Sequence, residues 1–436
     1  MRFRKSMCIT GMTLLAALAF APMRLTSQTA QTLYNIVPLD SLGGVSAAGN
    51  GINDRGWITG SANQSGDNVS HAASWMGAPQ VIDLGALGGP GFNSAVAWPI
   101  HSNNGVIAGI SDTNEDQPPA DNFSCYPFFA TGLPTGKVCK GFRWANGVMT
   151  PLPPFPGGIN SYATAVNNRG EIVGWAENGV HDSTCDTTVQ TLQFRAVIWE
   201  PDGTMKELTP LPGDSTSAAT AINDLGQVVG ISGACGIAVG GVSAAHSVLW
   251  QNGVPSEIPN LGGHTWNTPT AINNQGTVVG FSLPAGQDGT RNFEAFLWTQ
   301  ASGLVRVGKL SGDIRAEALG VNAKNQVVGL SRGGPHVFRA FIWQGGVMTD
   351  LNCLTVPGSQ FLLFANDIND RGEISGELFD PIAVFGPAFR GIPVPNATGS
   401  ACPAGVADAN GTQTENIPAS VRKRARKLVG DPLADN

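Results

Sequence analysis

The chain has 436 residues, of which 57 are glycine and 29 are proline, while only 13% are charged. This composition is typical of a protein made of short strands and tight turns, and it disfavours long helices. The formal net charge is −7, and an acidic balance of this kind disfavours a nucleic-acid-binding role.

The first thirty residues have the pattern of a secretory signal peptide. Three basic residues near the start precede an apolar run from Met12 to Pro22, and small and polar residues follow as far as Ala30. These are the three parts of such a signal. The apolar run is shorter than the roughly 18 residues that a membrane span needs, and no later stretch reaches that length. We therefore predict that residues 1–30 are a signal peptide and that the protein is secreted, extracellular or periplasmic, without a transmembrane segment.

A nine-residue phrase recurs along the rest of the chain. It reads INDRGWITG at Ile52, and the other copies begin at Val166, Ile222, Ile272, Val321 and Ile368, with a degenerate copy, HSNNGVIAG, at His101. Successive copies lie 47 to 65 residues apart, counted between their closing glycines. An Asn followed closely by Gly favours a tight turn between two strands, because the Asn side chain bonds nearby backbone and Gly accepts a positive φ.

A second phrase ends in tryptophan and lies between copies of the first. Its tryptophans are Trp75, Trp144, Trp199, Trp250, Trp298 and Trp343. A glycine-containing turn and a short apolar stretch follow, so that each unit offers four short strands. Seven such units predict an all-β, seven-bladed β-propeller in which the tryptophans pack between neighbouring blades. Six blades plus a degenerate unit is the alternative count.

The chain start resembles the piece that the last unit lacks. The final unit has no convincing fourth strand after Gly391, whereas residues 34–44 read like that strand and its following loop. We predict that the N-terminal strand completes the last blade, because such a clasp removes an open sheet edge. The propeller then spans residues 31–395. We expect residues 396–436 to form a flexible tail whose basic cluster, VRKRARKL at 421–428, is either a solvated end or a tether to an acidic surface.

Together the phrases INxxGxVVG, xAFxW and MxDLGxLGG resemble the HAF family of bacterial extracellular repeat proteins. The resemblance covers about residues 34–395 and implies an exported location and a repeat fold, but it brings no catalytic residues. Three features depart from the pattern: Asn325 replaces the turn glycine, Gly391 stands where tryptophan is expected, and the second copy is weak.

Six cysteines follow the signal peptide, and export into an oxidising compartment makes disulfides the expectation for them. They are Cys125, Cys139, Cys185, Cys235, Cys353 and Cys402. Four of them lie in three insertions, at residues 112–140, 176–193 and 232–245. These insertions are expected on one face of the propeller, where braced loops suit a binding surface. Of the fifteen pairings that six cysteines allow, we predict Cys125 with Cys139.

The second unit breaks the repeat at two positions. Trp98 stands where the other copies have a small residue or proline, and His101 stands where they have Ile or Val. Both would lie near the channel rim as candidate ligand-binding residues, although local repacking of a degenerate copy is the alternative. His264 and Trp266, in another loop of the same face, are a second candidate pair.

No catalytic, metal or cofactor motif accompanies these residues. The chain has no HExxH, no CxxC, no phosphate-binding loop and no GxSxG. The sequence therefore favours a monomeric, non-enzymatic binding or scaffold module for a protein, glycan or cell-envelope partner, with no metal and no cofactor. The alternative is a hydrolase or lyase acting on polysaccharide at the channel face, which would need paired carboxylates there.

Overall fold

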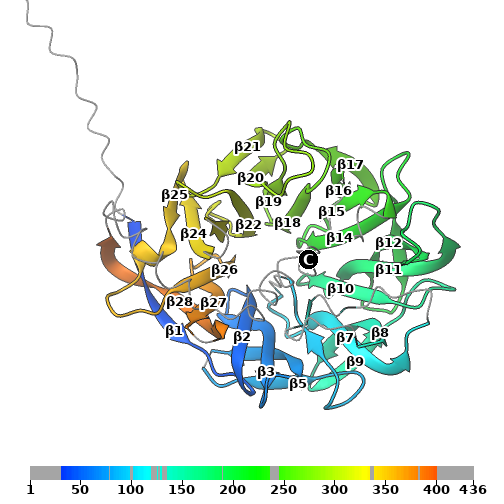
Figure 1. Ribbon diagram of the computed structural model, residues 1–436, viewed down its shortest axis with the longest axis horizontal. Coiled ribbons are helices and arrows are strands. Elements are labelled where there is room, and N and C mark those ends of the chain that lie inside the picture. The colour runs from blue at the N-terminus through cyan, green and yellow to red at the C-terminus, as the bar shows by residue number, and fades with distance from the viewer. Residues whose placement is uncertain are drawn as a thin grey trace, which may run out of the picture.

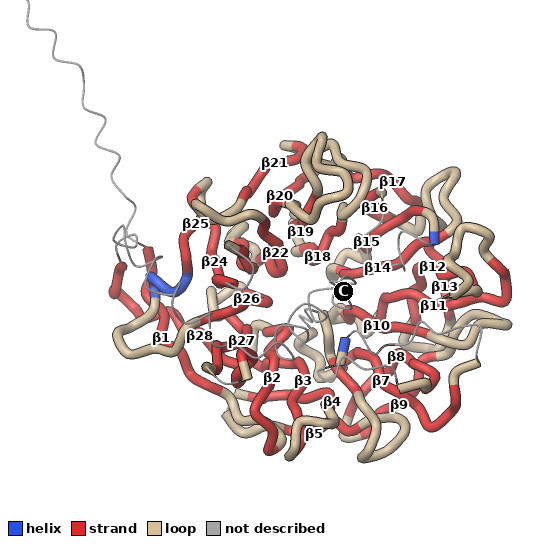
Figure 2. Tube along the Cα trace, viewed as in Figure 1, coloured by secondary structure: helices blue, strands red, loops and turns tan. Residues whose placement is uncertain are grey.

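The computed structural model describes residues 31–77, 79–98, 102–118, 125, 128–129, 135–188, 190–235, 245–333, 338–381 and 383–399. Seven four-stranded antiparallel sheets are arranged in a ring (Figure 1). Strands form nearly all of the regular structure in the described chain, with only short helical turns between them (Figure 2). The predicted all-β, seven-bladed propeller is confirmed. No helix in these ranges is long and apolar enough to cross a membrane.

Each blade is one sheet whose first strand lies nearest the ring centre. Blades 1 to 3 are β2 (Gly43–Ile52), β3 (Trp57–Gln64), β4 (Ser70–Met76), β5 (Ile82–Gly85); β6 (Ser94–Ala95), β7 (Ile107–Asp116), β8 (Lys137–Ala145), β9 (Val148–Leu152); and β10 (Ser161–Val166), β11 (Ile172–His181), β12 (Leu192–Trp199), β13 (Met205–Leu208). Blades 4 and 5 are β14 (Thr216–Ile222), β15 (Val228–Gly233), β16 (His246–Gln251), β17 (Val254–Ile258); and β18 (Thr268–Ile272), β19 (Val278–Ser282), β20 (Glu294–Thr299), β21 (Gly303–Gly308). Blade 6 is β22 (Arg315–Val321), β23 (Val327–Arg332), β24 (Phe338–Gln344), β25 (Val347–Asp350), and a 3₁₀ turn, η2 (Leu351–Leu354), follows it.

Blade 7 contains both ends of the propeller. It consists of β26 (Leu362–Ile368), β27 (Ile374–Asp380), β28 (Val384–Gly399) and, as its outermost strand, β1 (Gln31–Pro38). Tyr34 pairs with Pro393 in this ladder and is only 2% exposed. The predicted closure by the N-terminal strand is therefore confirmed. The degenerate second unit also forms a full blade, although its inner strand β6 has only two residues.

The repeated asparagine links neighbouring blades as well as forming a turn. Asn223 Oδ1 accepts hydrogen bonds from the backbone N–H groups of Leu225 and Gln227, and Asn223 Nδ2 donates to the carbonyl of Asn273 in the next blade, at 3.0 Å. Gly226 closes the turn at a φ of 77°. The same bonds to a neighbouring blade are made by Asn53, Asn167, Asn273, Asn322 and Asn369. We call the side of the ring that carries these turns the turn face.

The apolar core lies in layers between adjacent blades. One layer joins Val173 and Ala196 of blade 3 to Val228 and Trp250 of blade 4. The indole of Trp250 is buried, and its N–H donates to the carbonyl of Thr209 at 2.7 Å. Burial between sheets is the role predicted for the repeated tryptophans, because a wide aromatic ring fills the space that opens between diverging blades.

Candidate functional site

A belt of hydrogen bonds joins the inner strands of blades 3 to 6. Thr164, Thr220 and Thr270 stand three residues before the repeated asparagine, and each hydroxyl donates to a carbonyl of the next blade. Asn366 makes the equivalent contact from blade 7 to Gly49 of blade 1. The polar side chains at this position are therefore used to hold the ring together.

The belt is interrupted in blade 6, where Leu319 occupies the threonine position. A cavity of about 240 Å³ lies beside it. Residues of blades 1, 2, 6 and 7 line it, among them Ala48, Asn50, Ala97, Glu317, Phe364 and Glu377. The cavity thus spans the part of the ring where the two ends of the repeat array meet.

Glu317 is the most unusual residue of this cavity. Its side chain extends from the inner strand β22, and the residue is 8% exposed. Among the described residues, no hydrogen bond reaches its Oε1 atom. Burial raises the pKa of the Glu317 carboxyl to about 7, although the positive charges of Arg315 and Arg332 oppose the shift. The neutral and the ionised form of Glu317 are therefore both populated near neutral pH.

A second carboxyl, Glu377 of β27, lines the same cavity and is 6% exposed. The hydroxyl of Ser46 lies 3.5 Å from its Oε1 atom. A protonated carboxylic acid can donate a hydrogen bond, whereas a carboxylate only accepts them. Two buried carboxyls, one of which is easily protonated, can therefore donate hydrogen bonds to the hydroxyl groups of a ligand and accept hydrogen bonds from them. They can also exchange a proton with the ligand.

Trp98 lies behind the cavity wall in an aromatic cluster. Its ring centroid is 4.7 Å from that of Phe128 and 5.4 Å from that of Trp175, on which Tyr162 stacks at 4.9 Å. Phe128, in the insertion of blade 2, itself lines the cavity. Trp98 is half-buried and supports this phenylalanine. The other predicted residue of this unit, His101, lies outside the described residues.

The second predicted pair is placed in two different environments. His264 is exposed, and its backbone N–H donates to Asp288 Oδ1 at 2.8 Å. Trp266 is buried, with its ring centroid 5.4 Å from that of Phe293 and with the Arg291 guanidinium 5.2 Å above it. Trp266 and Trp98 belong to separate apolar clusters.

Two disulfides brace the inserted loops. Cys125 is bonded to Cys139, as predicted, with their Cα atoms 5.5 Å apart. Cys185 is bonded to Cys235, which joins the insertion of blade 3 to that of blade 4. Cys353 is disulfide-bonded as well, and Cys402 lies outside the described residues. We call the side of the ring that carries these loops the insertion face.

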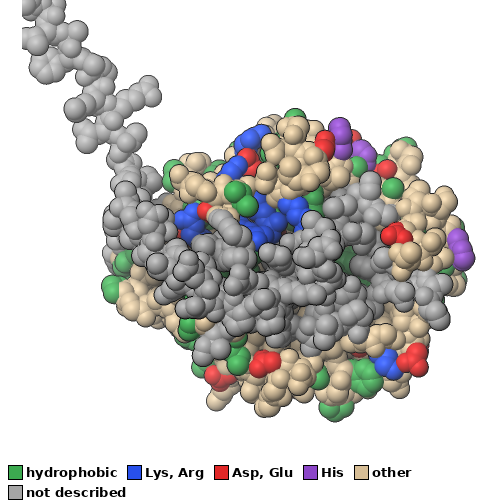
Figure 3. Space-filling view, in the orientation of Figure 1, with side chains coloured by type: hydrophobic (Ala, Val, Ile, Leu, Met, Phe, Trp, Pro, Cys, Tyr) green, Lys and Arg blue, Asp and Glu red, His purple; other side chains and the backbone are tan. Residues whose placement is uncertain are grey.

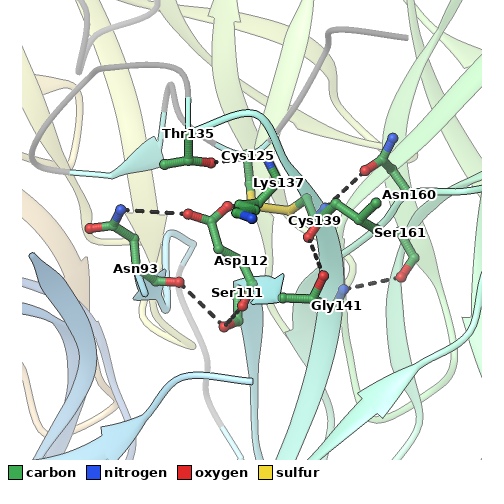
Figure 4. The surroundings of a disulfide bond; sticks show 12 residues. Asn93, Ser111, Asp112, Cys125, Thr135, Lys137, Cys139, Gly141, Asn160 and Ser161 are labelled. Carbon is green, nitrogen blue, oxygen red and sulfur yellow. Dashed lines mark hydrogen bonds between the residues drawn. A yellow bond between two sulfur atoms is a disulfide. The ribbon is translucent and has the colours of Figure 1, made fainter. Parts of the chain in front are cut away.

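Asp112 lies beside the first disulfide, with Asn93 on its other side (Figure 4). Its Oδ1 atom is 3.6 Å from Cys125 Sγ, which has no proton to donate because it is part of a disulfide. Burial raises the pKa of the Asp112 carboxyl to about 6. Near the second disulfide, Asp182 lies within 4.8 Å of both sulfur atoms. Those sulfurs are bonded to each other, so they do not offer the thiolates that a metal site would use.

Neither glutamate of the cavity is among the site residues predicted from the sequence. Glu317 stands five residues before the repeated asparagine, where the other copies have Ala48, Ala97, Tyr162, Ala218, Thr268 and Phe364. Glu377 directly follows the closing glycine, where the other copies have Ser61, Ile110, Trp175, Ile231, Phe281 and Leu330. Each is the single charged residue in its column of the repeat. Comparing the copies column by column would have found both.

No protein-family model matches the chain, and no curated protein matches it. Solved structures of similar shape include virginiamycin B lyase from Staphylococcus aureus, at 11% identity and a TM-score of 0.48 over 83% of this chain and 100% of that one. A streptogramin B lyase is similar at 13% identity and a TM-score of 0.46, over 82% and 97% of the two chains. A puromycin-hydrolyzing peptidase from Mycobacterium tuberculosis is similar at 10% identity and a TM-score of 0.46, over 84% of this chain and 55% of that one. At these values the similarities carry no argument about what this chain binds or does.

Proposed function

We propose that this protein is an exported binding module that holds a small hydroxyl-rich ligand, such as the end of a glycan chain, in the cavity beside Glu317. One observation carries the proposal: the buried carboxyl of Glu317, whose Oε1 atom accepts no hydrogen bond from the described residues, lines a cavity at the point where Leu319 interrupts the belt of hydrogen bonds between blades. A buried polar atom without a partner costs on the order of 1–3 kcal/mol. Its presence here favours a role in binding over a role in folding.

The lining of the cavity suits a sugar ring. Glu317 and Glu377 offer hydrogen-bonding groups to hydroxyls, and the rings of Phe128 and Phe364 offer apolar surface to the C–H face of a sugar. Ligand sites commonly combine an apolar lining with a few converging polar groups. This is the arrangement expected for a ligand with many hydroxyls and one apolar face.

Export is supported by the disulfides and by the signal-like residues 1–30. Disulfides such as Cys185–Cys235 persist in oxidising compartments and are rare in the cytosol. The resemblance of the repeat phrases to the HAF family supports the same location. We propose that the mature chain begins near residue 31 and acts as a monomer outside the cytoplasm.

A second candidate function is hydrolysis or lysis of a polysaccharide at the same cavity. The observation that favours it is a second carboxyl, Glu377, in the cavity that Glu317 lines, since a pKa of about 7 suits Glu317 to general acid catalysis. Glu377 would then serve as the base or nucleophile. Glu317→Gln would abolish turnover by such an enzyme while leaving substrate binding measurable.

Calorimetric titration of residues 31–436 with a glycan library tests the proposal. Ala48 lines the same cavity as Glu317, so Ala48→Trp should fill it without removing a carboxyl. We expect affinity for any glycan that binds to fall at least about tenfold. Ala301→Trp, on the exposed turn between β20 and β21, is the matched control and should leave affinity unchanged. Unaltered binding by Ala48→Trp would place the site elsewhere and contradict the proposal. Shortened glycan products would favour the second candidate.

A further inference from the structure

We infer that the ligand of the cavity carries a protonated primary amine, as an amino sugar does, and that this amine pairs with the carboxyl of Glu317. This inference rests on the proposed ligand cavity and specifies the chemical class of its ligand.

Glu317 is a buried acid that lacks a hydrogen-bonding partner for one oxygen. It is 8% exposed, it lines the cavity, and its Oε1 atom accepts no hydrogen bond from the described residues. Burial raises the pKa of its carboxyl to about 7, even though the charges of Arg315 and Arg332 lower it. Buried charges in proteins are normally paired. A cationic group of a ligand would give the ionised carboxyl this pairing.

The lining of the cavity suits a cation better than an anion. Among the described residues that line it, Glu317 and Glu377 are acidic and none is basic. An anion in this space would be repelled by both carboxylates, because like charges at short range interact strongly where water is excluded. Phe128, Phe364 and Phe385 line the same space. The face of an aromatic ring carries partial negative charge and attracts ammonium groups.

The strands packed against β22 bring few other charges to Glu317. Their charged residues are Arg332 of β23, Glu294 of β20 and Asp367 of β26. Glu294 is already paired with basic residues of blade 5, and Asp367 Oδ2 accepts the backbone N–H of Ile52 at 2.8 Å. None of these residues lines the cavity. Glu317 and Glu377 are therefore the charged groups that a ligand in the cavity would meet.

Basic side chains gather on the surface of blades 5 and 6, as the space-filling view shows (Figure 3). Arg306 and Lys309 both pair with Glu294, and Arg339 pairs with Asp313 at 2.7 Å. These residues do not line the cavity either. Their charges thus belong to ion pairs of the blades, outside the space that the ligand would occupy.

The size of the cavity and the chemistry of its lining favour an amine on a single ring. The volume of about 240 Å³ is smaller than the roughly 300–1,000 Å³ of sites for drug-sized ligands. An ammonium group has three N–H donors, whereas a hydroxyl has one. Hydrogen bonds between charged groups are about twice as strong as neutral ones. An amino sugar combines an ammonium group for Glu317 with a C–H face for the phenylalanine rings.

Four probes separate the contribution of the amine from that of the sugar. Glucosamine carries the amine and N-acetylglucosamine does not, and cyclohexylamine and cyclohexanol give the same comparison without a sugar. Calorimetric titration of residues 31–436 measures each affinity. We expect each amine to bind at least about tenfold more tightly than its neutral partner. Ala48→Trp should weaken this binding at least about tenfold, because Ala48 lines the cavity.

Glu317→Gln should remove the preference for the amine and leave the affinity for the neutral partner unchanged. Glu257→Gln, which alters a half-exposed glutamate of β17, is the matched control and should keep the preference. The pH dependence gives a second readout on the parent protein. Cyclohexylamine stays charged near neutral pH, as a lysine side chain does. Its affinity should rise at least about fivefold from pH 5.5 to pH 7.5, because the Glu317 carboxyl ionises as the pH approaches its pKa of about 7.

Equal affinities within both pairs of probes would overturn the inference. So would a preference for the amine that survives in Glu317→Gln, or an affinity for cyclohexylamine that falls as the pH rises from 5.5 to 7.5. Binding of neutral glycans in the cavity, with no preference for either amine, would refute this inference alone. Cyclohexylamine binding that Ala48→Trp weakens, without binding of any sugar, would refute only the proposed glycan ligand.

Discussion

The inner strands of blades 4 and 6 are built from the same repeat, yet they use their side chains differently. In blade 4, Thr220 donates its hydroxyl to Pro269 of the next blade. In blade 6, the same position holds Leu319, and the residue two places earlier is Glu317, whose Oε1 accepts no hydrogen bond from the described residues. Blade 4 thus shows the hydrogen bond that joins one blade to the next. Blade 6 lacks this hydroxyl, and a cavity lies beside it. The departure from the repeat is what marks the candidate site.

Removing strand β1, which closes the ring, should destabilise blades 4 and 6 at once. This is the largest effect on stability that we expect. Strand β1 forms the outer edge of blade 7. Its residue Tyr34 is buried in an apolar cluster with residues of blades 6 and 7. A chain that begins at Leu39 leaves β28 unpaired on one side. We predict that its melting temperature falls by about 10 °C or more relative to a chain that begins at Gln31. Circular dichroism at increasing temperature measures this. Equal melting temperatures would show that the ring does not depend on the clasp.

Weakening the asparagine turn of blade 4, without changing the cavity, should have the next largest effect on stability. Asn223→Ala removes two bonds accepted within the turn and two donated bonds, to Gln227 Oε1 and to the carbonyl of Asn273. We expect a loss of about 3 kcal/mol in the free energy of unfolding, because buried backbone groups lose their partners. Urea denaturation measures it. Asn274→Ala, one position further along the next turn and exposed, is the control and should cost about 1 kcal/mol or less.

Replacing Glu317 by a neutral residue should stabilise the folded protein, in contrast to the two changes above. The pKa of Glu317 is raised to about 7 in the folded protein, so the folded state holds this proton more tightly than the unfolded state. Stability contributed by the protonated form is therefore lost as pH rises from about 4.5 through 7. We expect Glu317→Gln to be more stable than the parent by on the order of 3 kcal/mol at pH 8 and about equally stable at pH 4.

Urea midpoints at a series of pH values test this, with Asp112→Asn as the control. The pKa of Asp112 is raised from 3.8 to about 6, so the gain from removing its charge should develop between these two pH values and end about one pH unit before the gain from Glu317→Gln ends. A Glu317→Gln variant that is less stable than the parent at pH 8 would mean that the carboxylate is bonded in the folded protein.

Restoring the repeat in blade 6 should have the smallest effect on stability and a clear effect on binding. Leu319→Thr returns a hydroxyl to the belt, where it would donate to the carbonyl of Ala365, the position equivalent to Pro269. We expect a change in unfolding free energy of within about 1 kcal/mol. Ligand affinity, measured by calorimetry, should change because Leu319 lines the cavity. Thr220→Ser, which keeps the hydroxyl in blade 4, should leave affinity unaltered.

The fold was predictable because it repeats. Each copy of the asparagine turn adds independent support for the same strand pair, and the match between residues 34–44 and the missing last strand indicated closure by β1. The Cys125–Cys139 pairing was also predicted correctly, since both residues belong to one insertion. The link between Cys185 and Cys235 was not, because it joins loops of two blades that are close only after the ring forms.

The cavity was not predictable by the same reasoning. Glu317 and Glu377 each interrupt one column of the repeat, but nothing local indicates that Glu317 lines a space shared with Ala48 and Phe128, far away in the chain. That arrangement depends on ring closure and on the path of the blade 2 insertion. The aromatic residue that did stand out, Trp98, supports Phe128 from behind. Unusual residues were thus found near the site, while the polar groups that define it required the tertiary structure.

A crystal structure of residues 31–436 soaked with the best-binding glycan of the library tests the central claim most directly. We predict electron density for the ligand in the cavity beside Glu317, with a ligand oxygen within hydrogen-bonding distance of the Glu317 carboxyl. Density confined to the outer surface of the inserted loops, with the cavity unchanged, would contradict the account.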